Sequence, residues 1–306
     1  MDLEATARDG LDDEVFAVFE GELREVLRTV PYNSAAQFVD IFGDGERSPR
    51  LGAACVFQTL EVARRVEERT GIPARLIPDG RHLAAIFEYE GGLVLLDPYL
   101  LHTTPIHIEA RTVRAGSGRV VSTAAPVRTD SRGVVRPGRL TARYRTYGGG
   151  WVVRLEYSKF SPTRGRYLLS RLFTLRSEDA FGRPDGRLRV EALPREFLTS
   201  ILTDPEQTSL SIRALDDSLE HTSEVILPLH GYAGRNFSAG DLWLRDSAGV
   251  AYPPADPAAA PVWDELVAST GLASTDLVDH LLCAADIYRS VADPDDDVQP
   301  YSFESE

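Results

Sequence analysis

The sequence predicts an α+β fold with an N-terminal helical region, a central antiparallel β-barrel or sandwich, and a C-terminal helical segment. Helical periodicity in residues 11–29 and 53–70 predicts the first part, and helical patterns after residue 261 predict the last. From residue 106 to 250, short β-rich runs alternate with turn residues, which is typical of a barrel or sandwich. The predicted units are a helical domain (1–72), a β-rich domain (73–250), C-terminal helices (251–292) and a disordered acidic tail (293–306).

The N-terminal region contains two strong helical patterns. In residues 11–29 the apolar positions fall near one face, and Pro31 ends the pattern; a shorter helix is predicted over 34–41. In residues 53–70 the apolar side chains share one broad arc, and Gly71 and Pro73 follow in the order that usually ends a helix. Cys55 therefore lies in the first turn of this helix, on its buried side or at the edge of that side.

Strand patterns follow at 74–78, 82–89 and 93–97, with Gly91 and Gly92 as the expected turn between the last two. That turn pairs Ile86 with Asp97 and leaves His82 four residues away along the same face. Because each strand residue advances the chain by about 3.3 Å, this offset is too long for direct contact. A bulge or a shifted turn must close it.

Later segments complete the predicted fold. Strands are expected in the runs PIHIEARTVR, RVVSTAAPVRT, RLTARYRTY, WVVRLEYS, RYLLSRLFTLR, LSIRALDD, SEVILPL and DLWLRD. Residues 148–150, all glycine, predict a hairpin turn, and a helix is expected at 194–202. A Pro- and Ala-rich linker at 252–261 leads to helices at 262–269 and 275–290.

Composition narrows the classes of function. The chain has 306 residues and a net charge of −14, which disfavours nucleic-acid binding because phosphate contacts need a basic surface. The sequence contains no run of 18 apolar residues, so no membrane-spanning helix is predicted. The acidic N-terminus lacks the apolar core of a signal peptide. The two cysteines lie far apart and suggest no disulfide framework. The expected location is cytoplasmic, with no nucleic-acid or membrane partner.

Cys55, His82 and Asp97 follow one another on a helix, a strand and a strand end, and together could form a nucleophilic device. An imidazole can take the proton of a thiol, and a helix N-terminus favours the thiolate. A carboxylate behind the imidazole orients it and stabilises the imidazolium. A lone cysteine on an apolar helix face usually packs in the core. The hypothesis of a catalytic site therefore depends on all three residues occurring in this order.

The other histidines and the second cysteine have simpler expected roles. His102 and His107 lack enough companions for a zinc site, so no metal is predicted, although His102 could line the mouth of the site. Cys283 is expected to pack within a helix interface. The expected donors to an oxyanion are the Cys55 N–H and one further group, from Leu83, Gln37 or Asn33.

The segment from residue 30 to 108 resembles the thiol acyltransferase core shared by arylamine N-acetyltransferases and transglutaminase-like enzymes. The motifs are Val30-Pro31-Tyr32-Asn33, Arg50-Leu51-Gly52-Ala53-Ala54-Cys55, Arg81-His82-Leu83 and Leu95-Leu96-Asp97-Pro98. The run Gly71-Ile72-Pro73-Ala74-Arg75 is similar to the transglutaminase-like side. The resemblance implies a helical domain, a β-barrel and a closing domain, with Cys55, His82 and Asp97 as a catalytic triad.

The resemblance implies a cysteine acyltransferase that forms an acyl-cysteine and passes the acyl group to an amine or hydroxyl of a small molecule, as in secondary metabolism. No bound cofactor is expected. The implied co-substrate is acyl-coenzyme A or the thioester of an acyl carrier protein. Two alternatives stay open: a transglutaminase-like peptide hydrolase or cyclase, and a non-catalytic scaffold of the same fold.

Overall fold

The computed structural model describes residues 13–43, 47–181, 207–295 and 297–303, and it is an α+β protein with three antiparallel sheets. The helices of the described chain are α1 (Asp13–Thr29), α2 (Ala36–Phe42), α3 (Cys55–Thr70), α4 (Ala110–Ala115), α6 (Ala260–Thr270) and α7 (Ser274–Val291). The helices predicted at 11–29, 34–41, 53–70, 262–269 and 275–290 are thus confirmed where the chain is described, and that predicted at 194–202 lies outside the described residues.

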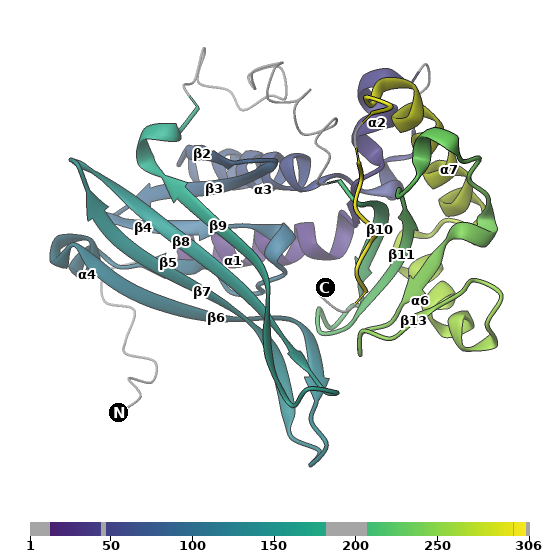
Figure 1. Cartoon of the computed structure of the whole chain (residues 1–306). Coiled ribbons are helices and arrows are strands. Elements are labelled where there is room, and N and C mark those ends of the chain that lie inside the picture. The colour runs from purple at the N-terminus through teal and green to yellow at the C-terminus, as the bar shows by residue number, and fades with distance from the viewer. Residues whose placement is uncertain (1–12, 44–46, 182–206, 296, 304–306) are drawn as a thin grey trace.

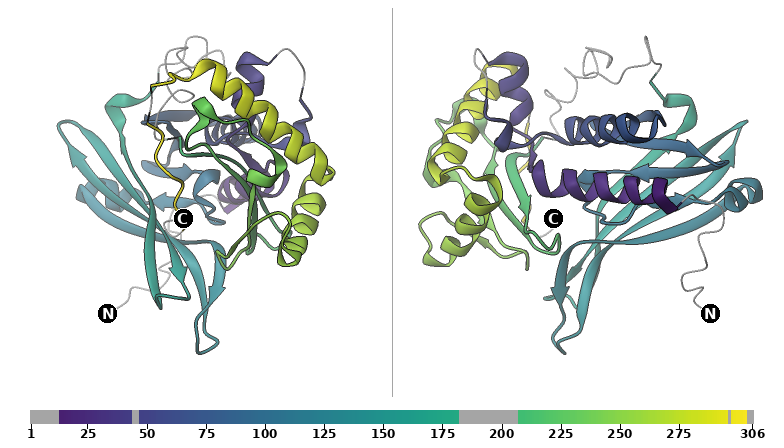
Figure 2. Two further views of the ribbon diagram at one scale, coloured as in Figure 1. Left: turned by 45° about the vertical axis from the view of Figure 1, so that its right-hand side comes forward. Right: turned by 180° about the vertical axis from the view of Figure 1, so that it is seen from behind.

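Two four-stranded sheets, formed by β2–β5 and by β6–β9, pack together with α1 and α3 (Figures 1 and 2). One sheet has the order β2 (Ala74–Asp79), β3 (His82–Tyr89), β4 (Gly92–Leu96) and β5 (Ile106–Ile108). The other has the order β6 (Ser117–Thr129), β7 (Val135–Tyr147), β8 (Gly150–Ser161) and β9 (Arg166–Arg176). Helices α1 and α3 cover one face of the β2–β5 sheet, and the long β6–β9 sheet lies on its other side (Figures 1 and 2).

These two sheets approach each other at both edges, yet neither closes into a barrel. Strand β5 lies beside β6, and β2 lies beside β9, where Phe181 N–H donates to the carbonyl of Leu76 at 2.9 Å. No strand ladder joins the sheets within the described residues. The barrel alternative of the sequence prediction is therefore wrong for the described chain, and the arrangement implied for an arylamine N-acetyltransferase stays a prediction.

The third sheet combines one strand from the N-terminal part of the chain with four strands from its C-terminal part. Its order is β1 (Tyr32–Asn33), β10 (Ser209–Leu215), β11 (Thr222–Pro228), β12 (Trp243–Arg245) and β13 (Ala251–Tyr252), with α6 packed on β10 and β11 and α2 against α7. Because β1 pairs with β10, Tyr32 lies opposite Arg213. This pairing brings residues of the N-terminal part beside a strand that follows some 180 residues later. The predicted domain boundaries stay a prediction.

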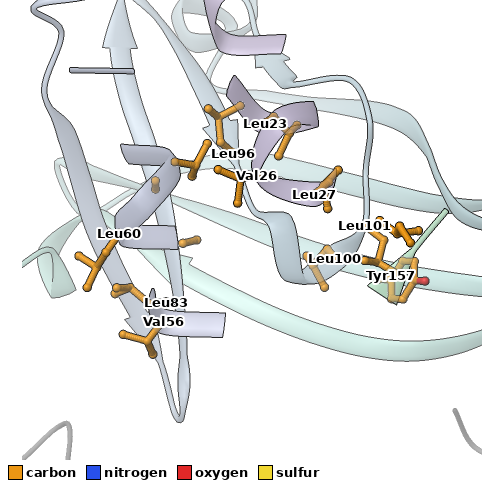
Figure 3. Close-up of a cluster of buried hydrophobic side chains, with 14 of the residues drawn as sticks. Leu23, Val26, Leu27, Val56, Leu60, Leu83, Leu96, Leu100, Leu101 and Tyr157 are labelled. Atoms are coloured by element: carbon orange, nitrogen blue, oxygen red, sulfur yellow. The ribbon is translucent and has the colours of Figure 1, made fainter. Parts of the chain in front are cut away.

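A hydrophobic core lies between the helices and the β2–β5 sheet (Figure 3). Leu23 and Val26 of α1 and Val56 of α3 are buried against Leu83 and Leu96 of the sheet. Each buried side chain of this size contributes about 1.5–3 kcal/mol to folding relative to an exposed one. The core therefore fixes α3 over β3, and this contact sets the position of Cys55 relative to His82.

Three local predictions need correction. PIHIEARTVR is a short strand followed by α4, because Gly116 in the left-handed region (φ 74°) ends a helical turn that the β pattern concealed. The tail predicted to be disordered packs in part: Val298 is 2% exposed, and its carbonyl accepts a hydrogen bond from His230 Nδ1. Cys283, expected to be packed, is exposed on α7. No helix of the described residues has the length and hydropathy that a bilayer crossing requires.

The loop before Cys55 depends on Gly52. Ala53 N–H donates to the Pro31 carbonyl at 2.9 Å, and Asn33 N–H donates to the Ala53 carbonyl at 2.8 Å, so this loop lies directly along residues 31–33. Gly52 has φ 77° and ψ −153°, and a Cβ there would lie 1.9 Å from the Pro31 carbonyl oxygen. The close approach therefore requires glycine.

Gly52→Ala should lower the free energy of unfolding by roughly 3 kcal/mol or more, because backbone strain and a main-chain clash combine. Denaturant unfolding measures the change. Gly71→Ala is the matched control, since Gly71 also has a positive φ (72°) but a Cβ there meets nothing within 4 Å. The control should lose only about 1–2 kcal/mol. Equal losses in the two variants would contradict the proposed role of the Pro31 contact.

Candidate functional site

The turn between β3 and β4 brings His82 and Asp97 together. The strands pair Tyr89 with Gly92 and Ile86 with Leu95, so the two turn residues are Glu90 and Gly91, with φ 48° and 74°. Positive φ at both positions is the requirement of a type I′ hairpin. The predicted turn at Gly91–Gly92 was wrong by one position. Either a bulge or a shifted turn was expected to bring His82 closer to Asp97, and the structure has the shifted turn.

This register places Asp97 two residues, not four, from His82. Continuing the observed pairing by one step sets Asp97 opposite Ala84, which makes His82 a diagonal neighbour on the same face. The Asp97 carboxylate Oδ2 accepts a hydrogen bond from His82 Nε2 at 2.7 Å, and both side chains are buried, at 0% and 3% exposure. A charge-assisted contact of this length fixes both the direction and the tautomer of the ring.

Helix α3 presents Cys55 to the other side of the ring. Ala54, with an extended backbone, precedes the helix, so Cys55 is its first residue. One turn later, Thr59 Oγ1 donates to the Leu83 carbonyl at 2.9 Å, which ties α3 to the strand residue after His82. The Cys55 thiol lies 3.7 Å from the Arg81 carbonyl oxygen. The nucleophile candidate is therefore held beside the start of β3.

The electrostatics of the ring depend on these two neighbours. Burial disfavours the charged ring, but the Asp97 carboxylate and the Cys55 thiol outweigh burial and raise the pKa of His82 to about 10. Because Nε2 is held by Asp97, Nδ1 is the nitrogen left for the thiol. Nδ1 is buried and forms no hydrogen bond with the described residues. Both neighbours of the ring therefore favour its charged form.

Two further residues, His102 and Phe173, hold His82 and Asp97 in position, and sequence analysis did not assign this role to either of them. His102 is fully buried, donates from Nδ1 to the Thr104 carbonyl at 2.8 Å, and accepts at Nε2 from the Asp97 N–H at 3.0 Å. Burial lowers the pKa of His102, which agrees with a neutral ring in this role. Phe173 of β9 stacks on His82, with ring centroids 3.9 Å apart. His102 therefore supports Asp97 rather than lining the mouth of the site.

A cavity of about 480 Å³ opens over Cys55 and His82. This volume lies within the usual range of small-molecule sites. Its lining combines the start of α3 with residues of all three sheets and of the segments that connect them: Tyr32, Ser34, Gln37, Ala54, Cys55, Asp79, Gly80, Arg81, His82, Tyr99, Arg171, Leu172, Phe173 and Gln207. A small ligand in this cavity would therefore lie against both candidate catalytic side chains.

Of the expected oxyanion donors, Asn33 is already occupied. Its amide nitrogen donates to the Leu51 carbonyl at 2.9 Å and contacts His280 Nε2 at 3.0 Å, while its oxygen accepts from the N–H groups of Ala35 and Ala36. Gln37 instead lines the cavity beside Cys55. Asn33 therefore positions the chain around the site, and Gln37 is the side-chain candidate that remains.

Among the described residues no cluster of three or more histidine, cysteine or acidic side chains could hold a metal ion. No protein-family model matches the chain, and no curated protein shows significant similarity to it.

Proposed function

We propose that the chain is a cysteine-dependent acyltransferase in which Cys55 is the nucleophile, His82 the acid–base group and Asp97 its orienting carboxylate. The observation that carries this proposal is the buried Asp97–His82 contact, which leaves the other ring nitrogen available to Cys55, the first residue of α3 and a direct neighbour of the ring. The same order of residues carries the resemblance to arylamine N-acetyltransferases. The proposed substrates are an acyl thioester, of coenzyme A or a carrier protein, and a small amine or alcohol.

The proposed reaction has two steps. The Cys55 thiolate attacks the carbonyl carbon of the thioester, and the departing thiolate takes a proton from the His82 imidazolium. The acyl-cysteine is then attacked by an amine or hydroxyl, whose proton passes to His82 as the C–S bond breaks. Asp97 keeps the ring in place through both steps. The first N–H groups of α3 have no partner within the helix and can donate to the developing oxyanion.

Gln37 would supply the second donor to that oxyanion. It is buried, lines the cavity next to Cys55, and its side chain forms no hydrogen bond with the described residues. Gln37→Ala should slow acyl-enzyme formation by roughly 10²-fold, the usual effect of losing one such donor. The rate is measured by quenching the acylation reaction at successive times and determining the intact mass of the protein. An unchanged rate would remove Gln37 from the mechanism.

The proposal is tested by incubating the protein with acyl thioesters of increasing chain length and following the intact mass. An acyl-sized mass gain that is lost on adding amines supports acyl transfer. A parallel incubation with peptides separates the open alternative, because cleavage or cyclisation of a peptide without thioester turnover would indicate a transglutaminase-like hydrolase or cyclase.

A further inference from the structure

The β6–β9 sheet has one buried face and one exposed face. Leu140, Tyr144 and Leu155 are buried in the core, so the alternating residues of the same strands point away from the β2–β5 sheet, α1 and α3 (Figures 1 and 2). Because the chain has a net charge of −14, a concentration of positive charge on this side runs against its overall composition. The outward side chains nevertheless form a surface that we call the basic face, which contains six exposed arginines: Arg119, Arg139, Arg143, Arg145, Arg154 and Arg176.

Three of these arginines form a row across the sheet, which we call the arginine row. Strand pairing sets Arg119 of β6 opposite Arg143 of β7, and Arg143 opposite Arg154 of β8. Like charges directly opposite each other on neighbouring strands destabilise a sheet. Among the described residues of these strands, Glu156 is the acidic side chain of the basic face, and its Oε1 lies 3.5 Å from Arg143 Nε and 3.2 Å from Arg154 Nε. One carboxylate therefore serves two arginines, and the row keeps an excess of positive charge.

Most of the arginines on the basic face have no counter-charge within the described chain. Four of the six form no ion pair with a described residue, namely Arg119, Arg139, Arg145 and Arg176. The guanidinium carbon of Arg139 lies 3.9 Å from the ring centre of Tyr167, so this contact positions the side chain and leaves its charge uncompensated. A group of exposed cations attracts a polyanion from solution, and a bound polyanion also offsets the repulsion within the arginine row.

The basic face meets the Cys55 cavity at the β9 edge of the sheet. Leu172 of β9 lies opposite Glu156, is 43% exposed on the basic face, and also lines the cavity. The next residue, Phe173, points to the other side of the strand and stacks on His82. A partner that covers the basic face therefore lies directly beside the cavity that contains Cys55 and His82.

The composition of the basic face favours a protein partner over other polyanions. In the row next to the arginine row, Val121 and Leu172 are 49% and 43% exposed, and Thr141 and Glu156 lie between them. Arginine mixed with exposed apolar side chains is typical of the centre of a protein–protein interface. A central carboxylate opposes the phosphates of a nucleic acid, and a chain of net charge −14 is repelled by an anionic bilayer, whereas a small acidic protein covers this one face alone.

We propose that the basic face is the docking surface for an acidic protein that carries the acyl group as a thioester and presents it to Cys55. This inference rests on the proposed function and chooses between its two donors, a carrier protein and free coenzyme A. Docking beside Leu172 brings the thioester to the cavity. The Cys55 thiolate then forms the new C–S bond, and the carrier thiol leaves with a proton from His82. The arginines attract and hold the carrier and take no part in this chemistry.

The test compares two donors of the same octanoyl group, an acidic acyl carrier protein that bears the octanoyl thioester and the neutral octanoyl thioester of N-acetylcysteamine. Below saturation, the variant Arg119→Gln/Arg143→Gln/Arg154→Gln should be acylated by the carrier protein about 10- to 100-fold more slowly than wild type, because electrostatic attraction raises association rates. Both proteins should react equally fast with the neutral thioester. Added salt should slow the carrier reaction of the wild type and have little effect on that of the variant.

The matched control is Arg24→Gln/Arg28→Gln/Arg64→Gln. It loses the same three charges from exposed positions on α1 and α3, which cover the opposite face of the β2–β5 sheet, and it should react with the carrier protein as fast as wild type. Equal acylation of the wild type and the arginine-row variant by the carrier protein would overturn the docking surface. An equal slowing with both donors would also overturn it, because the substitutions would then act on the catalytic site or the fold.

Calorimetry separates docking from catalysis. Cys55→Ala protein should bind the carrier protein, and the arginine-row substitutions in that background should weaken binding by about 10- to 100-fold. Carrier binding without acylation by either donor would leave the docking surface standing and refute the acyltransferase proposal, whereas acylation by the neutral thioester without carrier binding would do the reverse. Binding of anionic phospholipid vesicles or duplex DNA through the same arginines, without carrier binding, would assign the basic face to another polyanion and overturn the proposal.

Discussion

Cys55→Ala should abolish the acyl-sized mass gain that a reactive thioester produces in the wild-type protein. Removing the nucleophile of a triad lowers turnover by at least about 10³-fold, because neither the base nor the oxyanion donors can replace the covalent step. The readout is the intact mass after incubation, with peptide mapping to place the acyl group. Cys283→Ala is the control, since Cys283 is the only other thiol of the chain.

The two thiols also give an internal comparison. Cys283 is exposed and Cys55 is partly buried, so accessibility alone would let Cys283 react faster with iodoacetamide. A thiolate held beside the His82 imidazolium would reverse that order at pH 6. Retention of the mass gain in Cys55→Ala would contradict the proposed nucleophile. Faster labelling of Cys283 than of Cys55, together with no acylation, would favour the non-catalytic scaffold.

Helix periodicity and turn residues predicted the parts of this fold that depend on local sequence. The arc of apolar residues in 53–70 and the stop at Gly71 are short-range properties, and α3 begins and ends close to where they indicate. The position of the turn between β3 and β4 was harder to predict. A positive φ at Glu90 is uncommon for a residue with a side chain, so Gly91–Gly92 was the natural but wrong choice of turn.

The same reasoning explains which parts of the site the sequence could reveal. Cys55, His82 and Asp97 lie within 43 positions and follow a recognisable order. Phe173, in contrast, reaches His82 because β9 packs beside β2, and Arg213 lies opposite Tyr32 because β10 pairs with β1. His102 offered one signal, its place five residues after Asp97, but its burial and its bond to the Asp97 N–H depend on the turn at Leu101. Long-range pairing therefore set the surroundings of the triad.

Asp97→Asn should lower the rate of acyl-enzyme formation by about 10²- to 10⁴-fold while leaving the fold intact. The amide has nearly the shape of the carboxylate and can still accept from His82 Nε2, but it carries no charge. Burial then dominates, and the pKa of His82 falls below its usual value instead of rising to about 10. The ring would be neutral at pH 7, and the thiol would lose its cationic neighbour.

The pH dependence of stability separates this electrostatic role from a merely structural one. In the wild type the folded pKa of His82, about 10, exceeds the unfolded value of about 6.5, so the contribution to stability is complete below pH 6.5 and is lost as pH rises to 10. For one proton the slope reaches at most about 1.4 kcal/mol per pH unit. Denaturant unfolding of wild type and Asp97→Asn at pH 6.5, 8 and 9.5 should show their difference in free energy shrinking with pH. A constant difference, with acylation unchanged, would mean that Asp97 does not hold the ring charged.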